Sequence, residues 1–278
     1  MTRAHRRGRA PKMMSPLLAV ALLWVAAGSV AARGIDTPDS AGQGPVRAIG
    51  FDVSYPQCDD ELPAMFAFGI VGVNGGRVYA ENRCLAEQLE WAGPDAQLYL
   101  NTGNPGPRLS RFWPTGQGTP RVCSSRSPDS ASCAYNYGWN AAADSYARAL
   151  AAYVELGWAE PDATRTPAAV RWWLDVETAN SWRADPRLNV AALNGAVAFL
   201  ESMDVHEVGF YSAPRMWWSI TGGTDDFAAY PSWVAGASTL PGALDVCSGD
   251  GFTGGPVALA QFLQDGFDAN VECEDASQ

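Results

Sequence analysis

Residues 171–177 read Arg-Trp-Trp-Leu-Asp-Val-Glu, a largely apolar run that ends in two carboxylates. In a β-strand, side chains two residues apart share a face, so Asp175 and Glu177 point the same way, with Cα atoms about 6.6 Å apart. Carboxylates are costly at the end of a buried strand, and a close pair raises one pKa, which keeps a proton donor loaded near neutral pH. The segment therefore predicts a parallel strand with an acid at its C-terminal end. A helix cap or an ion pair with arginine is the open alternative.

Further short apolar segments indicate strands, and helical patterns lie between them. The expected strands, including the one just described, cover 48–53, 66–73, 97–101, 169–176, 208–211, 232–235 and 257–262. Helices are expected over 80–92 and 134–156, and after Asp185, which can cap a helix beginning at Pro186. Because strand and helix alternate over a length that suits one α/β barrel, we predict a single (β/α) TIM-like barrel over residues 48–278.

The first 32 residues have the composition of an export segment. Residues 1–32 resemble a secretory signal peptide, with basic residues up to Lys12, an apolar run over 17–27 and small residues before a cleavage site near Ala32. The apolar run is shorter than the roughly 18 residues of a membrane anchor. Residues 33–47 are expected to be a flexible lead-in. We expect a secreted, extracellular protein of the bacterial cell envelope, without stable membrane insertion after signal cleavage.

The cysteines all follow this segment: Cys58, Cys84, Cys123, Cys133, Cys247 and Cys273. In an oxidising compartment an even number most simply forms disulfides, and six cysteines allow fifteen pairings. The short separation of Cys123 and Cys133 favours a local loop, which suggests Cys58–Cys84 and Cys247–Cys273 for the rest. No Cys-x-x-Cys pair occurs, so we expect no metal or redox role for them.

Charge and histidine content exclude several classes of function. Of 19 basic residues, five lie in the first twelve, which leaves 14 against 30 acidic residues and a net charge of −16. Such a surface repels nucleic acid. The histidines are His5 and His206, so a multi-histidine metal site is impossible, and we expect a monomer without metal or cofactor. An ester or amide hydrolase would have to use His206, which precedes the strand at 208–211 and lies at the wrong end of it.

Two further acids stand at strand ends, Asp52 after an apolar run and Asp268 after the last expected strand. If the sheet closes into a barrel, acids from its first, middle and last strands meet at one mouth. Carboxylates together with aromatic residues suit sugar chemistry. Large aromatic side chains are more often core than binding residues. With that alternative open, the expected sugar-binding residues are Asn74, Asn101, Tyr211 and Trp233.

Residues 102–133 are rich in Gly, Pro and Ser and too long for an ordinary strand-to-helix connection. Long ordered loops tend to be functional. A surface insertion tied by a disulfide is an equally good interpretation of this segment.

Six short motifs follow one another along the chain, at 50–54 (Gly-Phe-Asp-Val-Ser), 174–177 (Leu-Asp-Val-Glu), 209–212 (Gly-Phe-Tyr-Ser), 232–235 (Ser-Trp-Val-Ala), 260–262 (Ala-Gln-Phe) and 268–270 (Asp-Ala-Asn). Together they resemble the family 25 glycoside hydrolases, secreted lysozymes that cleave after N-acetylmuramic acid in peptidoglycan. The resemblance implies that Glu177 is the general acid and that Asp175 orients the acetamido group of the sugar. It also implies that Asp52 and Asp268 complete a ring of carboxylates, and that the substrate's own acetamido group takes part in the reaction.

Two segments depart from the family pattern. Residues 71–76 read Val-Gly-Val-Asn-Gly-Gly where the family has Lys-x-x-Glu-Gly, and 98–101 read Leu-Tyr-Leu-Asn where it has Tyr-His. The sequence predicts a secreted glycoside hydrolase acting on peptidoglycan or another N-acetylated polysaccharide. A non-catalytic carbohydrate-binding or wall-associated protein on the same barrel is the alternative.

Overall fold

A computed structural model describes residues 48–159 and 165–273. The predicted signal peptide and lead-in lie outside these residues. Eight strands form a closed barrel in chain order, which confirms the predicted α/β barrel. Strands β1 to β7 pair in parallel, whereas β8 is antiparallel to both β7 and β1. Their bounds are β1 (Ile49–Val53), β2 (Gly69–Gly72), β3 (Gln97–Asn101), β4 (Arg171–Asp175), β5 (Glu207–Ser212), β6 (Ser232–Val234), β7 (Val257–Gln264) and β8 (Phe267–Glu272).

The eighth strand corrects the sequence-based expectation, which ended the sheet at residue 262 and placed Asp268 beyond it. Strand β7 continues to Gln264, and the chain turns back through Asp265 and Gly266, with φ of 53° and 87°. An Asp-Gly pair with positive φ at both positions forms a two-residue hairpin turn that matches the twist of paired strands. Asp268 consequently lies on β8, directly opposite Asp52 of β1.

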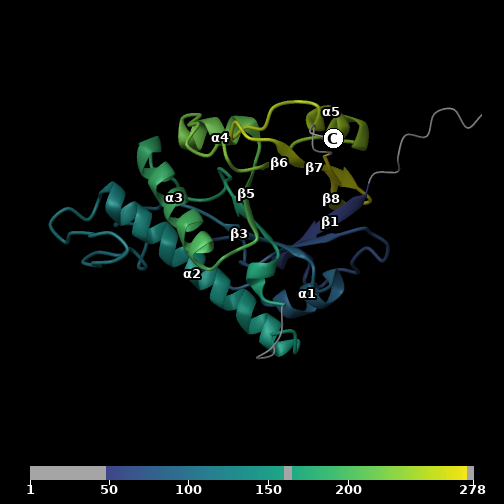
Figure 1. Cartoon of the computed structure of the whole chain (residues 1–278), viewed down its shortest axis with the longest axis horizontal. Helices are drawn as coiled ribbons and strands as arrows, with labels where there is room; N and C mark the ends of the chain where they lie inside the picture. Colours follow the sequence, from purple (N-terminus) through teal and green to yellow (C-terminus); the bar gives the residue numbers. More distant parts are fainter. Residues whose placement is uncertain (1–47, 160–164, 274–278) are drawn as a thin grey trace, which may run out of the picture. The chain divides into compact units, whose positions relative to one another are not determined.

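Helices cover the outside of the barrel (Figure 1). They are α1 (Leu85–Ala92), α2 (Ala131–Glu155), α3 (Pro186–Ser202), α4 (Pro214–Thr221) and α5 (Leu240–Cys247), with 3-10 turns η1 (Tyr55–Gln57) and η2 (Pro167–Ala169). The long helices α2 and α3 lie side by side (Figure 1). A Cβ on Gly138 would collide with the carbonyl oxygen of Ala192, and one on Gly195 with that of Tyr135. Glycine therefore lets the two backbones touch. No helix in the described ranges is long and apolar enough to cross a membrane.

The start of α3 agrees with the sequence-based expectation, whereas the start of α1 differs from it. The Asp185 side chain accepts a hydrogen bond from the Arg187 backbone at 3.1 Å, as expected for the cap of α3. Helix α1 begins at Leu85, so the expectation of a helix from residue 80 is wrong. Asn82 donates to the Gly72 carbonyl at 2.8 Å and accepts from the Cys84 backbone at 3.2 Å. These bonds hold residues 80–84 in a turn against β2.

The barrel interior is filled by Ile70, Trp173, Trp233 and Leu259. A Cβ on Gly209 would collide with the Trp173 ring, so glycine on β5 makes room for this indole. Most of the remaining core lies between the strands and helices α1 to α4. Since Trp173 precedes Asp175 by two residues on the same face of β4, the packed aromatic residues form a floor beneath the strand ends.

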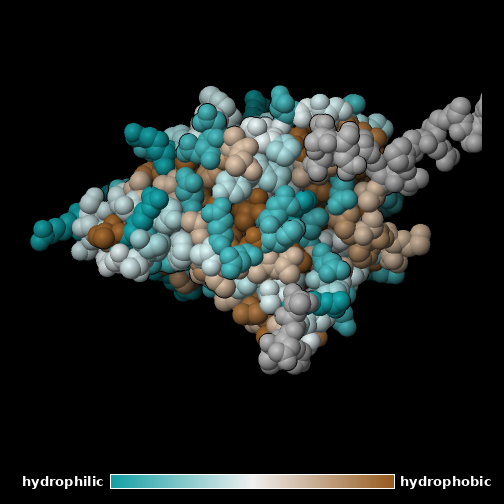
Figure 2. Space-filling model, viewed as in Figure 1, coloured by the Kyte–Doolittle hydropathy of each residue, from teal (hydrophilic) through white to brown (hydrophobic). Residues whose placement is uncertain are grey.

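All six cysteines are paired, in the suggested pattern of Cys58–Cys84, Cys123–Cys133 and Cys247–Cys273. The second disulfide ties the long loop between β3 and α2, which extends past the start of α2 (Figure 1). Figure 2 shows the same side of the molecule, with hydrophobic residues visible near the centre and mostly hydrophilic residues around them.

Candidate functional site

The four predicted acids gather at one end of the barrel. Asp175 is the last residue of β4, and Glu177 follows two residues later. Asp52 is near the end of β1 and faces Asp268 at the start of β8. Because β8 is antiparallel, its start lies at the same end of the barrel as the ends of the parallel strands. The acids therefore meet, although Asp268 arrives by a hairpin and not by a parallel strand.

Asp52 is 9% exposed and is fixed by two amides. Its Oδ2 accepts from Asn270 Nδ2 at 2.7 Å and from Gln261 Nε2 at 3.0 Å. Tyr211 in turn donates its hydroxyl to Gln261 Oε1 at 2.9 Å, and Trp233 donates Nε1 to Asn270 Oδ1 at 2.7 Å. Burial and the neighbouring Asp268 raise the pKa of Asp52 to about 7, against the two amide hydrogen bonds, which lower it. The protonation state of this carboxyl therefore changes near neutral pH.

Asp175 is 3% exposed, and Asn101 donates a hydrogen bond to its Oδ2. Its other oxygen, Oδ1, has no hydrogen-bond partner among the described residues. Burial and the charge of Glu177 hold the pKa of Asp175 well above the ordinary range, while the Asn101 bond favours the ionised form. One oxygen of this carboxyl is thus positioned by the protein, and the other is buried without a hydrogen-bond partner among the described residues.

Glu177 and Asp268 are only half-buried. Burial and the charge of Asp268 raise the pKa of Glu177, and burial raises that of Asp268. Four carboxyls that disfavour one another's ionisation retain protons at a higher pH than separate acids would. The arrangement can supply both a proton donor and ionised carboxylates at one place.

The four predicted sugar-binding residues have different placements. Tyr211 is half-buried at the mouth, and Asn101 contacts Asp175, so both border the acids. Trp233 is 1% exposed and packs against Tyr99, Trp173 and Tyr211. The predicted sugar contact of Trp233 does not fit this placement, because no face of the ring is open.

The prediction for Asn74 does not fit either. This side chain is 1% exposed, accepts from the Asn101 backbone at 2.9 Å and donates to Ser145 Oγ at 3.2 Å. Its donor and acceptor are therefore both used inside the protein. Asn74 supports the end of β3 instead of facing a ligand.

Two residues that fix Asp52, Gln261 and Asn270, are missing from the predicted site. In strands, alternate residues share a face, so Asn270 could have been assigned to the face of Asp268 had β8 been recognised. The Asp265-Gly266 turn was the available signal. Gln261 lies opposite Asn270 on β7.

His206 lies at the other end of the barrel. It is exposed, immediately before β5, and its backbone N–H donates to the Ala168 carbonyl at 2.7 Å. The acids lie at the C-terminal ends of the parallel strands. The geometry therefore gives no support to an ester or amide hydrolase that uses this histidine.

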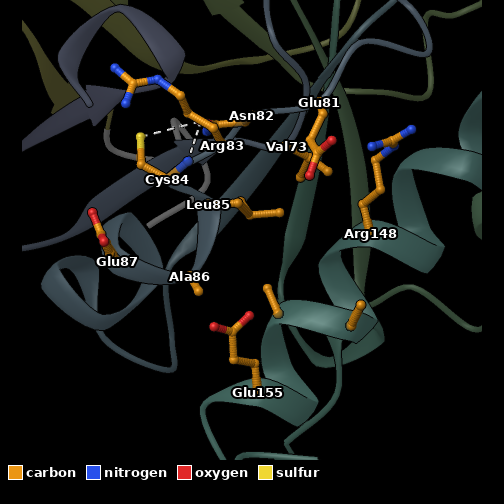
Figure 3. Close-up of a pocket in the computed structure, with 12 residues that line it drawn as sticks. Val73, Glu81, Asn82, Arg83, Cys84, Leu85, Ala86, Glu87, Arg148 and Glu155 are labelled. Carbon is orange, nitrogen blue, oxygen red and sulfur yellow. Dashed lines mark hydrogen bonds between the residues drawn. The ribbon is translucent and has the colours of Figure 1, made fainter. Parts of the chain in front are cut away.

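Cavities also lie outside the acidic cluster. One, of about 250 Å³, lies between the start of α1 and helix α2, where Glu81, Arg148 and Glu155 project from its walls (Figure 3). None of the four acids lines it. Another, of about 460 Å³, is formed by the long β3–α2 loop, residues 77–79, Tyr137 and residues 179–181, and the last of these segments lies just beyond Glu177.

Comparison with known proteins gives one local relative and several structural neighbours. No protein-family model matches the chain. A 63-residue segment is 35% identical to a Dictyostelium discoideum protein described as probable GH family 25 lysozyme 4. The match covers 23% of this chain and 29% of that relative, so it spans less than a third of the relative's length.

Solved structures extend the likeness to the fold. The chain is similar to a muramidase from Trichobolus zukalii, at 15% identity and a TM-score of 0.50, over 82% of this chain and 95% of the other. It is also similar to the spore cortex lytic enzyme SleM of Clostridium perfringens, at 13% identity and a TM-score of 0.51, over 83% and 68%. The resemblance to the family 25 glycoside hydrolases is therefore confirmed in one sequence segment, and the barrel fold is shared with a muramidase and a spore cortex lytic enzyme.

Proposed function

We propose that this protein is a glycoside hydrolase that cleaves an N-acetylated glycan, with bacterial peptidoglycan as the substrate. The observation that carries the proposal is the meeting of four carboxyls from β1, β4 and β8 at one mouth, each with a raised pKa. The similarity to a lysozyme in sequence and to a muramidase in fold supports the same chemistry.

Glu177 is the general acid in this proposal. Its side chain is half-buried, so it reaches a ligand at the mouth, and burial and the charge of Asp268 raise its pKa, which favours the protonated form. It protonates the glycosidic oxygen as the bond to the anomeric carbon breaks. Proton donation of this kind contributes about a hundredfold or more to a rate.

Asp175 orients the reacting sugar. Asn101 fixes one of its oxygens, and the other, Oδ1, is buried without a partner within the described ranges. In this proposal Oδ1 accepts the N–H of the substrate's acetamido group once the sugar is bound. The acetamido oxygen then attacks the anomeric carbon and gives a cyclic intermediate, which water opens. This route retains the sugar's configuration without a sugar bound covalently to the enzyme.

Asp52 and Asp268 complete the carboxylate ring. Asp52 is held in place by Asn270 and Gln261, and Asp268 is opposite it on β8. Ionised carboxylates at fixed positions stabilise the positive charge that develops on the sugar ring.

We also propose that the protein is secreted as a monomer after removal of residues 1–32. The three disulfides support an oxidising compartment.

The test measures reducing ends released from purified peptidoglycan and from a panel of N-acetylated glycans. Wild-type protein is expected to release them, and Glu177→Gln is expected to lose about a hundredfold or more of the rate. Glu90→Gln, an exposed position on α1, is the matched control and keeps full activity.

Release of nothing by the wild type, together with retained binding to insoluble peptidoglycan, would support the non-catalytic carbohydrate-binding alternative. Full activity in Glu177→Gln would remove this residue from the acid role.

A further inference from the structure

The cavity formed by the β3–α2 loop, residues 77–79 and residues 179–181 lies close to the acids along the chain. It has a volume of about 460 Å³ and includes Ala179, Asn180 and Ser181 in its wall. Consecutive Cα atoms are 3.8 Å apart, so the Cα of Ala179 lies within about 7.6 Å of the Cα of Glu177. On the opposite side, Gly103 follows Asn101 by two residues.

The walls of this cavity are joined by direct contacts. The Asn104 backbone donates to the Ser181 carbonyl at 2.7 Å, and a Cβ on Gly103 would lie 3.2 Å from that same oxygen. The β3–α2 loop and the β4–α3 turn are thus held together at the edge nearest the acids.

The charge of the cavity is opposite to that of the chain as a whole. Arg77 and Arg111 are its charged lining residues, and no carboxylate lines it. Neither arginine forms an ion pair with another described residue. The full chain carries a net charge of −11, so two exposed arginines beside the acidic mouth create a local site for an anionic group.

Aromatic side chains form another part of the wall. Tyr79 stacks on Phe112 with ring centroids 4.2 Å apart, and the Arg111 guanidinium lies 4.7 Å from the centre of the Phe112 ring. The Tyr79 hydroxyl has no hydrogen-bond partner in the described part of the chain. Apolar ring faces with two arginines beside them suit a short peptide that carries a carboxylate.

We propose that this cavity, lined by Arg77, Tyr79, Arg111 and Phe112, binds the carboxylate-bearing peptide attached to the glycan that is cut at the acids. The inference rests on the proposed function. It adds that the preferred substrate is a glycan with the peptide attached. It also assigns a role to the long loop between β3 and α2, which supplies half of the cavity wall.

Binding is measured with full-length Glu177→Gln protein, so that the glycan is not consumed. The probes are a peptidoglycan tetrasaccharide with free peptide carboxylates, the same compound with those carboxylates amidated, and the peptide-free tetrasaccharide. The free-carboxylate probe is expected to bind about fivefold or more tighter than the other two. Adding Arg77→Gln and Arg111→Gln removes this advantage, whereas Arg126→Gln, an exposed arginine elsewhere on the same loop, retains it.

The outcomes separate the two proposals. Equal binding of all three probes overturns the peptide site and leaves the glycan site intact. If the free-carboxylate probe still binds more tightly after both arginines are replaced, the peptide site is also overturned. If inorganic phosphate displaces the probes at constant ionic strength while the peptide gives no advantage, the cavity is a phosphate site and the peptide proposal is wrong. Absence of binding by every probe overturns the proposed function, and the peptide site with it.

Discussion

Replacing Asp52 with asparagine should change how the stability of the protein depends on pH. The folded protein holds the proton of Asp52 up to about pH 7, whereas an unperturbed aspartate releases it near 3.8. The stability associated with this proton is fully present below pH 3.8 and is lost as the pH rises through about 7, because the unfolded chain ionises more readily. At 1.36 kcal/mol for each pH unit, the loss is about 4 kcal/mol.

Asparagine cannot ionise, so Asp52→Asn escapes this loss. Its Oδ1 can accept the hydrogen bonds of Asn270 and Gln261 that Asp52 Oδ2 now receives. The free energy of unfolding of the variant and of the wild type is measured by urea denaturation at about pH 4 and at about pH 8. We expect the variant to gain about 4 kcal/mol of stability relative to the wild type between the lower and the higher pH.

Asp60→Asn is the matched control, since Asp60 is exposed. Its difference from wild type is expected to be the same at both pH values. If Asp52→Asn behaves like this control, Asp52 is not buried beside a second carboxyl, and the account of the acidic mouth is wrong.

Three other substitutions test separate parts of the structure. Gly138→Ala places a methyl group against the Ala192 carbonyl oxygen and should lower the free energy of unfolding by about 2 kcal/mol or more, measured by urea denaturation; an unchanged value would disprove the close α2–α3 contact. Replacing Cys247 and Cys273 with serine opens a link between residues 26 apart and should cost about 3 kcal/mol of stability in the same assay, and no loss would contradict the pairing. Asn101→Ala removes the bond that favours ionised Asp175, so the acidic limb of the pH–activity profile should move to higher pH; an unshifted limb would exclude a positioning role for Asn101.

The sequence predicted the barrel because apolar strands and amphipathic helices alternate over most of its length. Residues 171–175 form a strand that ends at Asp175, as the apolar run ending in acids indicated. The prediction lacks the antiparallel strand β8, because its signal in the sequence is the two-residue turn Asp265-Gly266 alone. The acids converged nonetheless, since an antiparallel strand returns its start to the mouth.

The depth of a side chain within the barrel was harder to predict. Tyr211 and Trp233 are register partners on neighbouring strands, yet Tyr211 is half-buried and Trp233 is fully enclosed. Strand periodicity assigns both to the inward face but does not distinguish the floor of the barrel from its mouth. The structural role of Asn74 could not be predicted either, because its hydrogen-bond partners Asn101 and Ser145 are distant in sequence.

A crystal structure of Glu177→Gln with a bound peptidoglycan oligosaccharide tests the central claim most directly. The account predicts that a glycosidic oxygen lies within hydrogen-bond distance of the side chain at position 177, with Asp52, Asp175 and Asp268 around the adjoining sugar. A sugar bound only in the cavity between α1 and α2, or elsewhere away from the barrel mouth, would contradict it.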